Sequence, residues 1–391
     1  MTTPGTNCFH FADRALDPEK RELWVGKAVR ETETRVFDLI AYLLEHRDRV
    51  VSRDELQETL WPTVVMTAAS LSRTIMQAHK ALDDDAQKPE IIRTVSRRGF
   101  RFIADVRPPD SSALHIDGLS EVHFVRNGKA RIAWRTIGDS RPDILFAPGF
   151  VSHLELRYRA SNAADFDMQL AHRRRLITFD KRGVGLSDRL GPAATIKDTV
   201  SDMRAVLDAT GSQRVILFAV SESGPAACLF AAQYPQRVAA LILYGTFAKG
   251  LKDHDYPHMP SHRSHDEWLT HLIGNWGKPA SLDLFAPSQV DNPHSRDSWA
   301  HYLRASATPG SAKNILTVAR DYDVRNILPK ICCPTLVLHR TGDKLVDWRA
   351  GRDLAAAIPG SEFIALDGID HWWFVGDQQG VLDAMQPYLD L

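Results

Sequence analysis

The sequence has few cysteines, no long apolar run and almost no net charge. Its four cysteines show no Cys-x-x-Cys spacing, which fits reduced thiols better than a disulfide framework or a zinc site. No run of 18 uncharged apolar residues occurs, and the first residues lack the pattern of a secretion signal. We therefore expect a cytoplasmic protein without a membrane partner. The formal net charge of −1 gives no sign of nucleic-acid binding by the chain as a whole. Any such binding must therefore depend on a local basic patch.

What is present is a chain of 391 residues with 44% hydrophobic and 25% charged residues, which predicts two or three globular domains. Helical apolar spacing first occurs over residues 33–46. A second helix is predicted from Ser52, because Glu55 stands three residues later as in a capping box. A third amphipathic helix is predicted over 68–82, which places three helices in the first part of the chain.

A hairpin follows these helices. Two β-rich segments flank Gly99, which can take the positive φ of a tight turn. Between Ile91 and Arg107 there are five arginines and one aspartate, a local charge of +4 that suits phosphates. Three helices and a hairpin predict an α+β winged helix-turn-helix domain over residues 8–106. A winged helix can also serve only as a protein-binding module.

The domain resembles the C-terminal DNA-binding domain of bacterial response regulators of the OmpR/PhoB type. The motifs that carry the resemblance are RVVSRDEL (49–56), SLSRTIMQAHKAL (70–82) and IRTVSRRGFRF (92–102). In that family the third helix enters the major groove of double-stranded DNA and the wing reaches the adjacent backbone or minor groove. The third helix has few basic residues, so affinity is expected to rely on the wing and on dimerisation, with a homodimer as the assembly to test. The resemblance implies DNA contacts by Ser70, Ser72, Arg73, Gln77, Lys80, Arg97, Arg98 and Arg101.

A linker is predicted at 107–119, because this stretch carries paired prolines and paired serines. From residue 120 to 391, apolar strands alternate with helices. This alternation predicts a mostly parallel sheet with helices on both faces. A polar insertion at about 248–313 is expected to form a helical cap.

The stretch Arg214–Tyr244 reads as a buried strand, a Ser-Glu-Ser-Gly-Pro corner, a helix and a second strand. With the order of the flanking elements, it resembles the α/β-hydrolase fold, whose nucleophile elbow is G-x-S-x-G. Here Ala219 and Ser223 replace the two glycines. We take Ser221 as the nucleophile because it directly follows the strand and leaves Pro225 in the first helical turn. A competing frame makes Ser223 the nucleophile.

The resemblance also implies the partners of this serine. Asp343 follows the next-to-last strand and His371 lies in the loop after the last one, where the family places its acid and base. Asp370 is a less suitable acid, because as a chain neighbour of His371 it cannot easily face the ring. The backbone N–H groups of Phe150 and Glu222 are the expected oxyanion hole.

Two further groups of residues have side chains of the kinds that bind ligands. The loop 252–258 holds two histidines and two aspartates but no defined ligand spacing, so we expect neither a metal nor a cofactor. Tryptophans in the cap and beside His371 either line an apolar pocket or form the core of the cap. These aromatic residues are Trp268, Trp276, Trp299, Trp372, Trp373 and Phe374.

Two hypotheses follow from this organisation. In the first, the protein is a transcriptional regulator whose hydrolase-like domain binds a small ester, lactone or related acyl ligand, with or without hydrolysing it. In the second, it is a serine esterase of the carboxylic ester hydrolase type with an accessory N-terminal module. The order Ser, Asp, His favours activity, whereas the replaced elbow glycines favour a binding site, because a fold alone does not establish chemistry.

Overall fold

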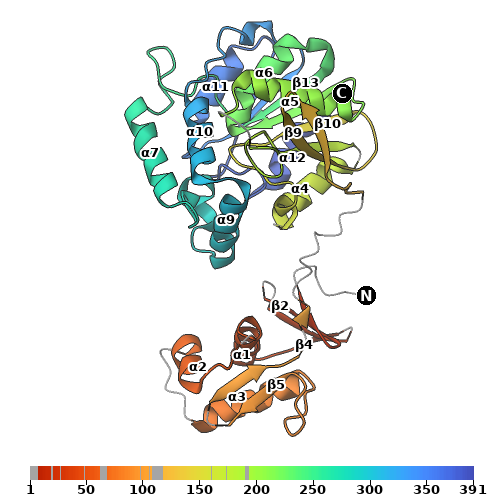
Figure 1. The fold of residues 1–391 in the computed structure, drawn as a ribbon, viewed down its shortest axis with the longest axis vertical. Helices are drawn as coiled ribbons and strands as arrows, with labels where there is room; N and C mark the ends of the chain where they lie inside the picture. The colour runs from red at the N-terminus through yellow and green to blue at the C-terminus, as the bar shows by residue number, and fades with distance from the viewer. Residues whose placement is uncertain are drawn as a thin grey trace. The chain divides into compact units, whose positions relative to one another are not determined.

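The computed structural model describes residues 8–18, 21–26, 28–47, 49–61, 68–96, 98–104, 106–107, 118–159, 161–172, 174–189 and 193–391. The chain divides into two compact units, Met1–Leu114 and His115–Leu391 (Figure 1). Of the predicted linker, residues 108–117 lie outside the described ranges. Its first residue, Arg107, lies in a strand.

The first unit begins with short antiparallel strands, followed by three helices. Its five-stranded sheet has the order β4-β3-β2-β1-β7. The strands are β1 (Phe9–Phe11), β2 (Arg14–Asp17), β3 (Glu22–Val25), β4 (Ala28–Arg30) and β7 (Val106–Arg107). The helices are α1 (Thr34–Glu45), α2 (Arg53–Leu60) and α3 (Ala68–Ala81).

The three helices of this unit form where the apolar spacing predicts them. Val36, Phe37 and Ile40 of α1 are buried in one cluster with Leu71 and Ile75 of α3. The N-terminus of α2 is capped as predicted, since the Ser52 side chain accepts a hydrogen bond from the Glu55 N–H at 3.1 Å. The apolar stripes of the helices therefore cover one another.

The wing is the hairpin of β5 (Ile92–Val95) and β6 (Gly99–Phe102). Gly99 has a φ of +141°, and a Cβ there would lie 1.9 Å from the carbonyl oxygen of Val51. This close approach lets Val51 and Phe100 exchange two backbone hydrogen bonds of 2.8 and 2.9 Å. The glycine is therefore required for packing as well as for the turn.

The second unit is built on an eight-stranded sheet with the order β15-β14-β13-β12-β10-β11-β9-β8. All neighbours are parallel except β8 with β9 and β9 with β11. The strands are β8 (His123–Asn127), β9 (Ala130–Ile137), β10 (Asp143–Ala147), β11 (Leu176–Phe179), β12 (Val215–Val220), β13 (Val238–Tyr244), β14 (Thr335–Arg340) and β15 (Glu362–Leu366).

Helices cover both faces of this sheet (Figure 1). Residues of α5 (Ile196–Ala209), α6 (Gly224–Gln233) and α11 (Trp348–Ala356) share one core cluster with the strands. On the other face, α4 (Ser161–Ala171) packs on β9 and β11, and α12 (Gln378–Leu389) packs on β13, β14 and β15. The two-domain fold class, winged helix followed by α/β-hydrolase fold, is confirmed.

The chain between β13 and β14 forms the cap. Its helices are α7 (His262–Gly274), α8 (Leu282–Phe285), α9 (Pro293–Ser306) and α10 (Pro309–Arg320). They share a core cluster that includes Phe285 and Trp299 and also Phe150 and Val184 from loops of the sheet. The short 3-10 turns of the unit are η1 (Leu156–Arg159), η2 (Ser221–Ser223), η3 (Pro235–Arg237), η4 (Pro287–Gln289) and η5 (Leu328–Lys330). Within the described residues, no helix is long and apolar enough to cross a membrane.

Candidate active site and DNA-binding surface

The corner between β12 and α6 has the geometry of a nucleophile elbow. Ser221 has a φ of +54°, a conformation that non-glycine residues seldom adopt and that occurs where function demands it. Pro225 lies in the first turn of α6, as the sequence predicts. Within this corner the backbone packs most tightly at Gly224, where an added Cβ would lie 2.0 Å from Thr246 Oγ1. The corner therefore requires a glycine at position 224, one residue after Ser223, where the G-x-S-x-G motif has its last glycine.

The two serines of the corner have different partners. Ser221 Oγ lies 2.9 Å from His371 Nε2. Ser223 is fully buried, and its Oγ donates a hydrogen bond to the Pro148 carbonyl at 2.5 Å. Of these two serines, Ser221 is the one placed beside a histidine.

His371 connects this serine to a carboxylate. Its Nδ1 lies 2.7 Å from Asp343 Oδ2, and both side chains are buried. The other oxygen of Asp343 accepts the N–H groups of Leu345 and Val346 at 2.9 and 3.1 Å. An Asp–His–Ser chain of this kind fixes the imidazole tautomer and can take a proton from the serine hydroxyl.

A second histidine contacts the same carboxylate. His339 Nε2 lies 3.2 Å from Asp343 Oδ2 and 2.9 Å from the Val346 carbonyl. Burial alone would raise the pKa of the Asp343 carboxyl, but the imidazoles of His371 and His339 hold that pKa well below its ordinary value. Asp343 is therefore held as a carboxylate.

The loop that carries His371 is fastened from two sides. The buried Arg340 guanidinium donates hydrogen bonds to the carbonyls of Asp370 and Trp372 at 3.2 and 3.0 Å. On the other side, the Phe285 carbonyl of the cap accepts the N–H groups of His371 and Trp372 at 3.0 and 3.2 Å. The position of the base thus depends on β14 and on the cap.

Asp370, the alternative acid, has a structural contact instead. Its Oδ1 accepts the N–H of Ser288 in the cap at 3.0 Å. After β13, where the family can place its acid, Gly245 has a φ of +57°, and a Cβ there would lie 3.1 Å from His371 Cε1. The glycine therefore leaves room for the imidazole.

The turn after β10 faces the nucleophile. A Cβ on Gly149 would lie 3.2 Å from Ser221 Cβ, so this backbone passes directly over the serine. In the described part of the chain, no hydrogen bond uses the backbone N–H of Phe150 or of Glu222 as its donor. Two free N–H groups beside a nucleophile are what an oxyanion hole requires.

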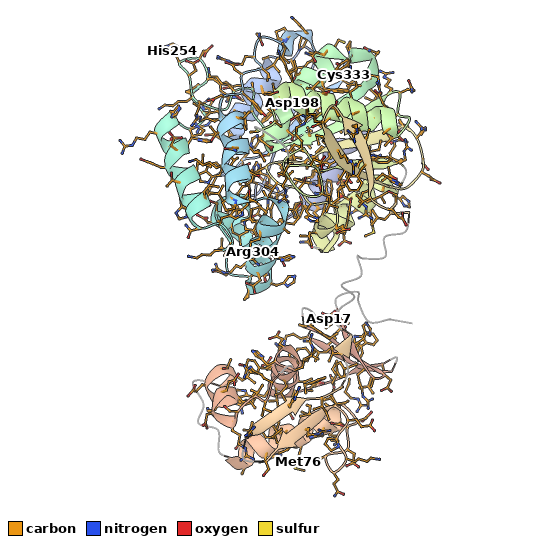
Figure 2. All side chains as sticks on the ribbon, in the orientation of Figure 1. Asp17, Met76, Asp198, His254, Arg304 and Cys333 are labelled. Carbon is orange, nitrogen blue, oxygen red and sulfur yellow. The ribbon has the colours of Figure 1, made fainter. Side chains whose placement is uncertain are left out.

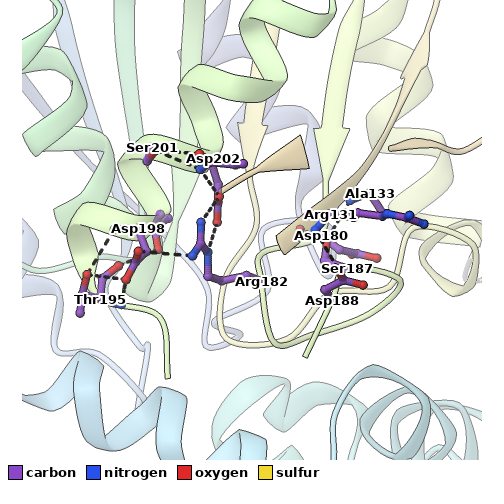
Figure 3. A network of polar contacts seen from close by, with 12 residues as sticks. Arg131, Ala133, Asp180, Arg182, Ser187, Asp188, Thr195, Asp198, Ser201 and Asp202 are labelled. Carbon is purple, nitrogen blue, oxygen red and sulfur yellow. Dashed lines mark hydrogen bonds and ion pairs between the residues drawn. The ribbon is translucent and has the colours of Figure 1, made fainter. Parts of the chain in front are cut away.

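The loop after β11 is rigidly held next to this turn. Asp180 Oδ1 accepts the Ser152 hydroxyl at 2.6 Å, and its Oδ2 accepts the Leu186 N–H at 2.9 Å. Arg182 pairs with Asp202 of α5 at 2.6 Å and also reaches Asp198 (Figure 3). The residue between them, Lys181, points to the elbow and contacts Glu222.

The predicted aromatic residues divide between two environments. Trp276 and Trp299 donate their indole N–H groups to the carbonyls of Ala307 and Ala280, which makes them part of the cap core. Trp372 lies 4.9 Å from Trp299, centroid to centroid, whereas Trp373 packs on Phe146 of the sheet at 5.3 Å. Trp268 packs on His265, and Phe374 contacts both Trp372 and Trp373.

The polar loop 252–258 has charged partners in the same unit. Asp253 pairs with Lys249 at 2.8 Å, and His258 lies 3.4 Å from Asp353. Asp255 pairs with Arg325 at 2.6 Å. These side chains of the loop thus pair with residues elsewhere in the unit as well as with a neighbour in the chain.

In the first unit, the residues expected to face DNA lie on α3 and the wing. Ser70, Ser72, Arg73 and Lys80 are exposed on α3, and Arg98 and Arg101 are exposed on the wing. Gln77 is partly buried and donates a hydrogen bond to Glu33 at 3.2 Å. Arg97 lies outside the described residues.

Two further residues on this surface were not among the expected contacts. Met76 of α3 is 68% exposed, and Figure 2 labels it on this unit. Its spacing from Ser72 and Lys80, four residues each way, would have placed it on their face. Arg93 lies directly opposite Arg101 in the wing, and both are exposed. Like charges in this arrangement repel, which favours an anionic partner between them.

The family of the second unit follows from the comparison with known proteins. Residues 142–377, more than half of the chain, match the family model described as alpha/beta hydrolase fold. The chain belongs to the alpha/beta hydrolase fold family. Residues 27–102 match a second model, described as transcriptional regulatory protein, C terminal. This hydrolase-family chain therefore carries a DNA-binding domain of transcriptional regulators at its N-terminal side.

Relatives exist for each part of this alpha/beta hydrolase. The transcriptional activator CadC of Escherichia coli is 33% identical over 75 residues, which cover 19% of this chain and 15% of CadC. The mitochondrial palmitoyl-protein thioesterase ABHD10 of mouse is 24% identical over 233 residues, 60% of this chain and 69% of that protein. An esterase from Exiguobacterium antarcticum has the same fold, with a TM-score of 0.60 and 21% identity, over 68% of this chain and 99% of that one.

Proposed function

We propose that this protein is a transcriptional regulator whose hydrolase domain binds a small ester, lactone or related acyl compound at Ser221 and hydrolyses it. The observation that carries the proposal is the hydrogen-bonded chain Ser221–His371–Asp343 in a polypeptide that also carries a DNA-binding domain. The protein would then detect the ligand at the same site at which it hydrolyses it.

The chemistry follows the order of these contacts. Ser221 Oγ attacks the acyl carbonyl carbon while His371 Nε2 takes its proton, and Asp343 stabilises the resulting imidazolium. The oxyanion is held by the N–H groups of Phe150 and Glu222. The carbon–oxygen bond to the leaving alkoxide breaks as His371 returns the proton. Water repeats the sequence on the acyl-serine and releases the carboxylic acid.

The test of the site is labelling by a serine-directed fluorophosphonate and turnover of a short-chain nitrophenyl ester. Ser221→Ala is expected to lower turnover on the order of 10⁶-fold, because the reacting oxygen is removed. Ser223→Ala is expected to retain labelling, since its hydroxyl faces Pro148. Loss of labelling in Ser223→Ala together with retained labelling in Ser221→Ala would show that Ser223 is the nucleophile.

The test of the regulator is a genome-wide DNA-binding profile with and without acyl esters. Specific sites whose occupancy changes with the ester support the proposal. In gel shifts on such a site, Arg73→Ala and Arg98→Ala should weaken binding, and binding should fall as salt rises, because phosphate contacts release counterions. Arg349→Ala, an exposed arginine of the hydrolase unit, is the matched control.

A serine esterase with an accessory N-terminal module is the second candidate. The short Ser–His and His–Asp distances favour it, because they leave the site ready for turnover. Rapid turnover together with a binding profile that shows no specific sites would support this candidate over the regulator.

A further inference from the structure

Three polar side chains are buried beside the nucleophile but take no part in the Ser221–His371–Asp343 chain. Lys181 and Glu222 are each 7% exposed, and Ser223 is 1% exposed. Lys181 Nζ contacts Glu222 Oε1 and lies 3.4 Å from Ser223 Oγ. The cluster joins the carboxyl ends of β10, β11 and β12, where ligands bind in open α/β sheets.

In the part of the chain that the structure describes, only one oxygen of the carboxylate in this cluster has a hydrogen-bond partner. Among the described residues, Glu222 Oε2 has no hydrogen-bond partner although it is buried. Buried polar atoms nearly always have partners, because an unmade hydrogen bond is costly in a dry environment. The free oxygen therefore needs a donor from outside the described chain.

The free oxygen and the nucleophile lie against the same backbone turn. A Cβ on Gly149 would lie 3.2 Å from Ser221 Cβ and 3.7 Å from Glu222 Oε2. The Gly149 backbone therefore lies against both groups, and Ser223 holds this turn in place through its bond to Pro148. A ligand on Ser221 thus comes close to the free oxygen.

The charged residues on either side of Lys181 have partners of their own. Asp180 is bound to Ser152 and backbone N–H groups, and Arg182 is bound to Asp202. Burial lowers the pKa of Lys181 to about 7, and its Nζ contacts Glu222 Oε1. Lys181 therefore holds one oxygen of Glu222 and leaves the other free.

We propose that Glu222, held by Lys181, is a polar subsite that accepts a hydrogen bond from a hydroxyl or amide N–H on the acyl part of the ligand. The inference rests on the proposed function, because Ser221 must receive the acyl carbonyl. The donor lies close to that carbonyl, since the Glu222 side chain begins at the residue whose N–H faces the oxyanion. The ligand class is therefore acyl groups with a hydrogen-bond donor one or two carbons from the carbonyl, rather than plain alkanoyl groups.

The test compares nitrophenyl butyrate with nitrophenyl 3-hydroxybutyrate, which differ by one hydroxyl. The wild-type protein should prefer the hydroxyester at least about tenfold in kcat/KM, since a site built for a donor rejects the analogue without it. The double variant Lys181→Met with Glu222→Leu leaves no lone buried charge. In this variant the kcat/KM of the hydroxyester divided by that of the butyrate should fall to near one. Lys197 is exposed on α5, so Lys197→Met is the control and should keep the wild-type ratio of the two kcat/KM values.

Equal kcat/KM for the two esters in the wild type, or a preference that survives in the double variant, overturns the subsite and leaves the proposed function standing. Binding of methyl 3-hydroxybutyrate and methyl butyrate to Ser221→Ala, measured by calorimetry, tests the subsite without turnover. Tighter binding of the hydroxyester supports it and equal binding overturns it. Absence of fluorophosphonate labelling of Ser221 in the wild type would instead refute hydrolysis.

Discussion

Ser221 is held in a strained backbone conformation by contacts that lie outside its own motif. Gly224 approaches Thr246, whose hydroxyl donates to the Ser221 carbonyl at 2.5 Å. The strained conformation of Ser221 is thus stabilised by Thr246, which lies 25 positions further along the chain. Positive φ at a reactive serine exposes its Oγ at the top of the sheet.

We expect Gly224→Ala to destabilise the protein by about 1–3 kcal/mol, because the added methyl group would overlap Thr246 Oγ1. Gly274→Ala is the matched control, since a Cβ at Gly274 meets nothing within 4 Å and alanine favours the helix. Urea unfolding of both variants measures the difference. A similar free energy of unfolding for both would show that the corner can relax around a side chain.

The second prediction at this scale concerns acid stability. The folded-state pKa of Asp343 is lowered, so its contribution to stability is full above the unfolded pKa of about 4 and is lost as pH falls below it. The free energy of unfolding of wild type minus that of Asp343→Asn should therefore shrink between pH 6 and about pH 3. Urea titrations at both pH values measure it, and a constant difference would mean that the carboxylate is not held in its ionised form.

At the scale of elements, the wing is joined to the recognition helix by one carboxylate. Asp84 Oδ2 lies 2.9 Å from His79 Nδ1 of α3 and accepts the Ile92 N–H at 3.0 Å. Its Oδ1 accepts the N–H groups of Glu90 and Ile91. Both α3 and the wing are thus positioned by the same side chain.

Asp84→Ala should weaken DNA binding by more than tenfold and speed amide exchange at residues 90–92, because three N–H groups lose their acceptor. The cost in stability should be about 2–3 kcal/mol. Asp85→Ala is the control, since Asp85 is exposed and, within the described residues, its side chain accepts only the Gln87 N–H. Exchange measured by mass spectrometry and gel shifts tests both variants, and equal behaviour would contradict the role of Asp84.

The cap and the catalytic loop form a second pair of coupled elements. The Phe285 carbonyl binds the backbone of His371, and the Phe285 ring lies 6.4 Å from that of Phe150 and 6.1 Å from the imidazole. A ligand that displaces this segment of the cap would also move the base. Such a connection gives a sensor a route from ligand contact to the geometry of the site.

For the whole molecule, the proposed sensing requires a measurable coupling between the two units. A reversible alkylboronic acid that binds Ser221 should change the affinity for specific DNA by about 5- to 150-fold, and DNA should change boronate affinity by the same factor. Fluorescence anisotropy and calorimetry measure the two factors, with Ser221→Ala as control. Unchanged DNA affinity in saturating boronate would show that the units act independently.

The sequence alone determined the two-domain fold class, which depends on local apolar spacing and on the order of elements along the chain. It also placed Ser221, Asp343 and His371 at strand exits, and parallel strands bring such exits to one edge of a sheet. The capping of α2 by Ser52 was predictable for the same reason, since its signal lies within four residues.

Only the tertiary structure decided which side chains support these residues. Arg340 of β14 and Phe285 of the cap contact the loop that carries His371, and no local pattern marks them. The pairing of Lys181 with Glu222 joins residues 41 positions apart, and the turn at Gly149 lies against Ser221 and Glu222 only once the strands align. Contacts between distant segments depend on packing, which periodicity and motif spacing do not encode one residue at a time.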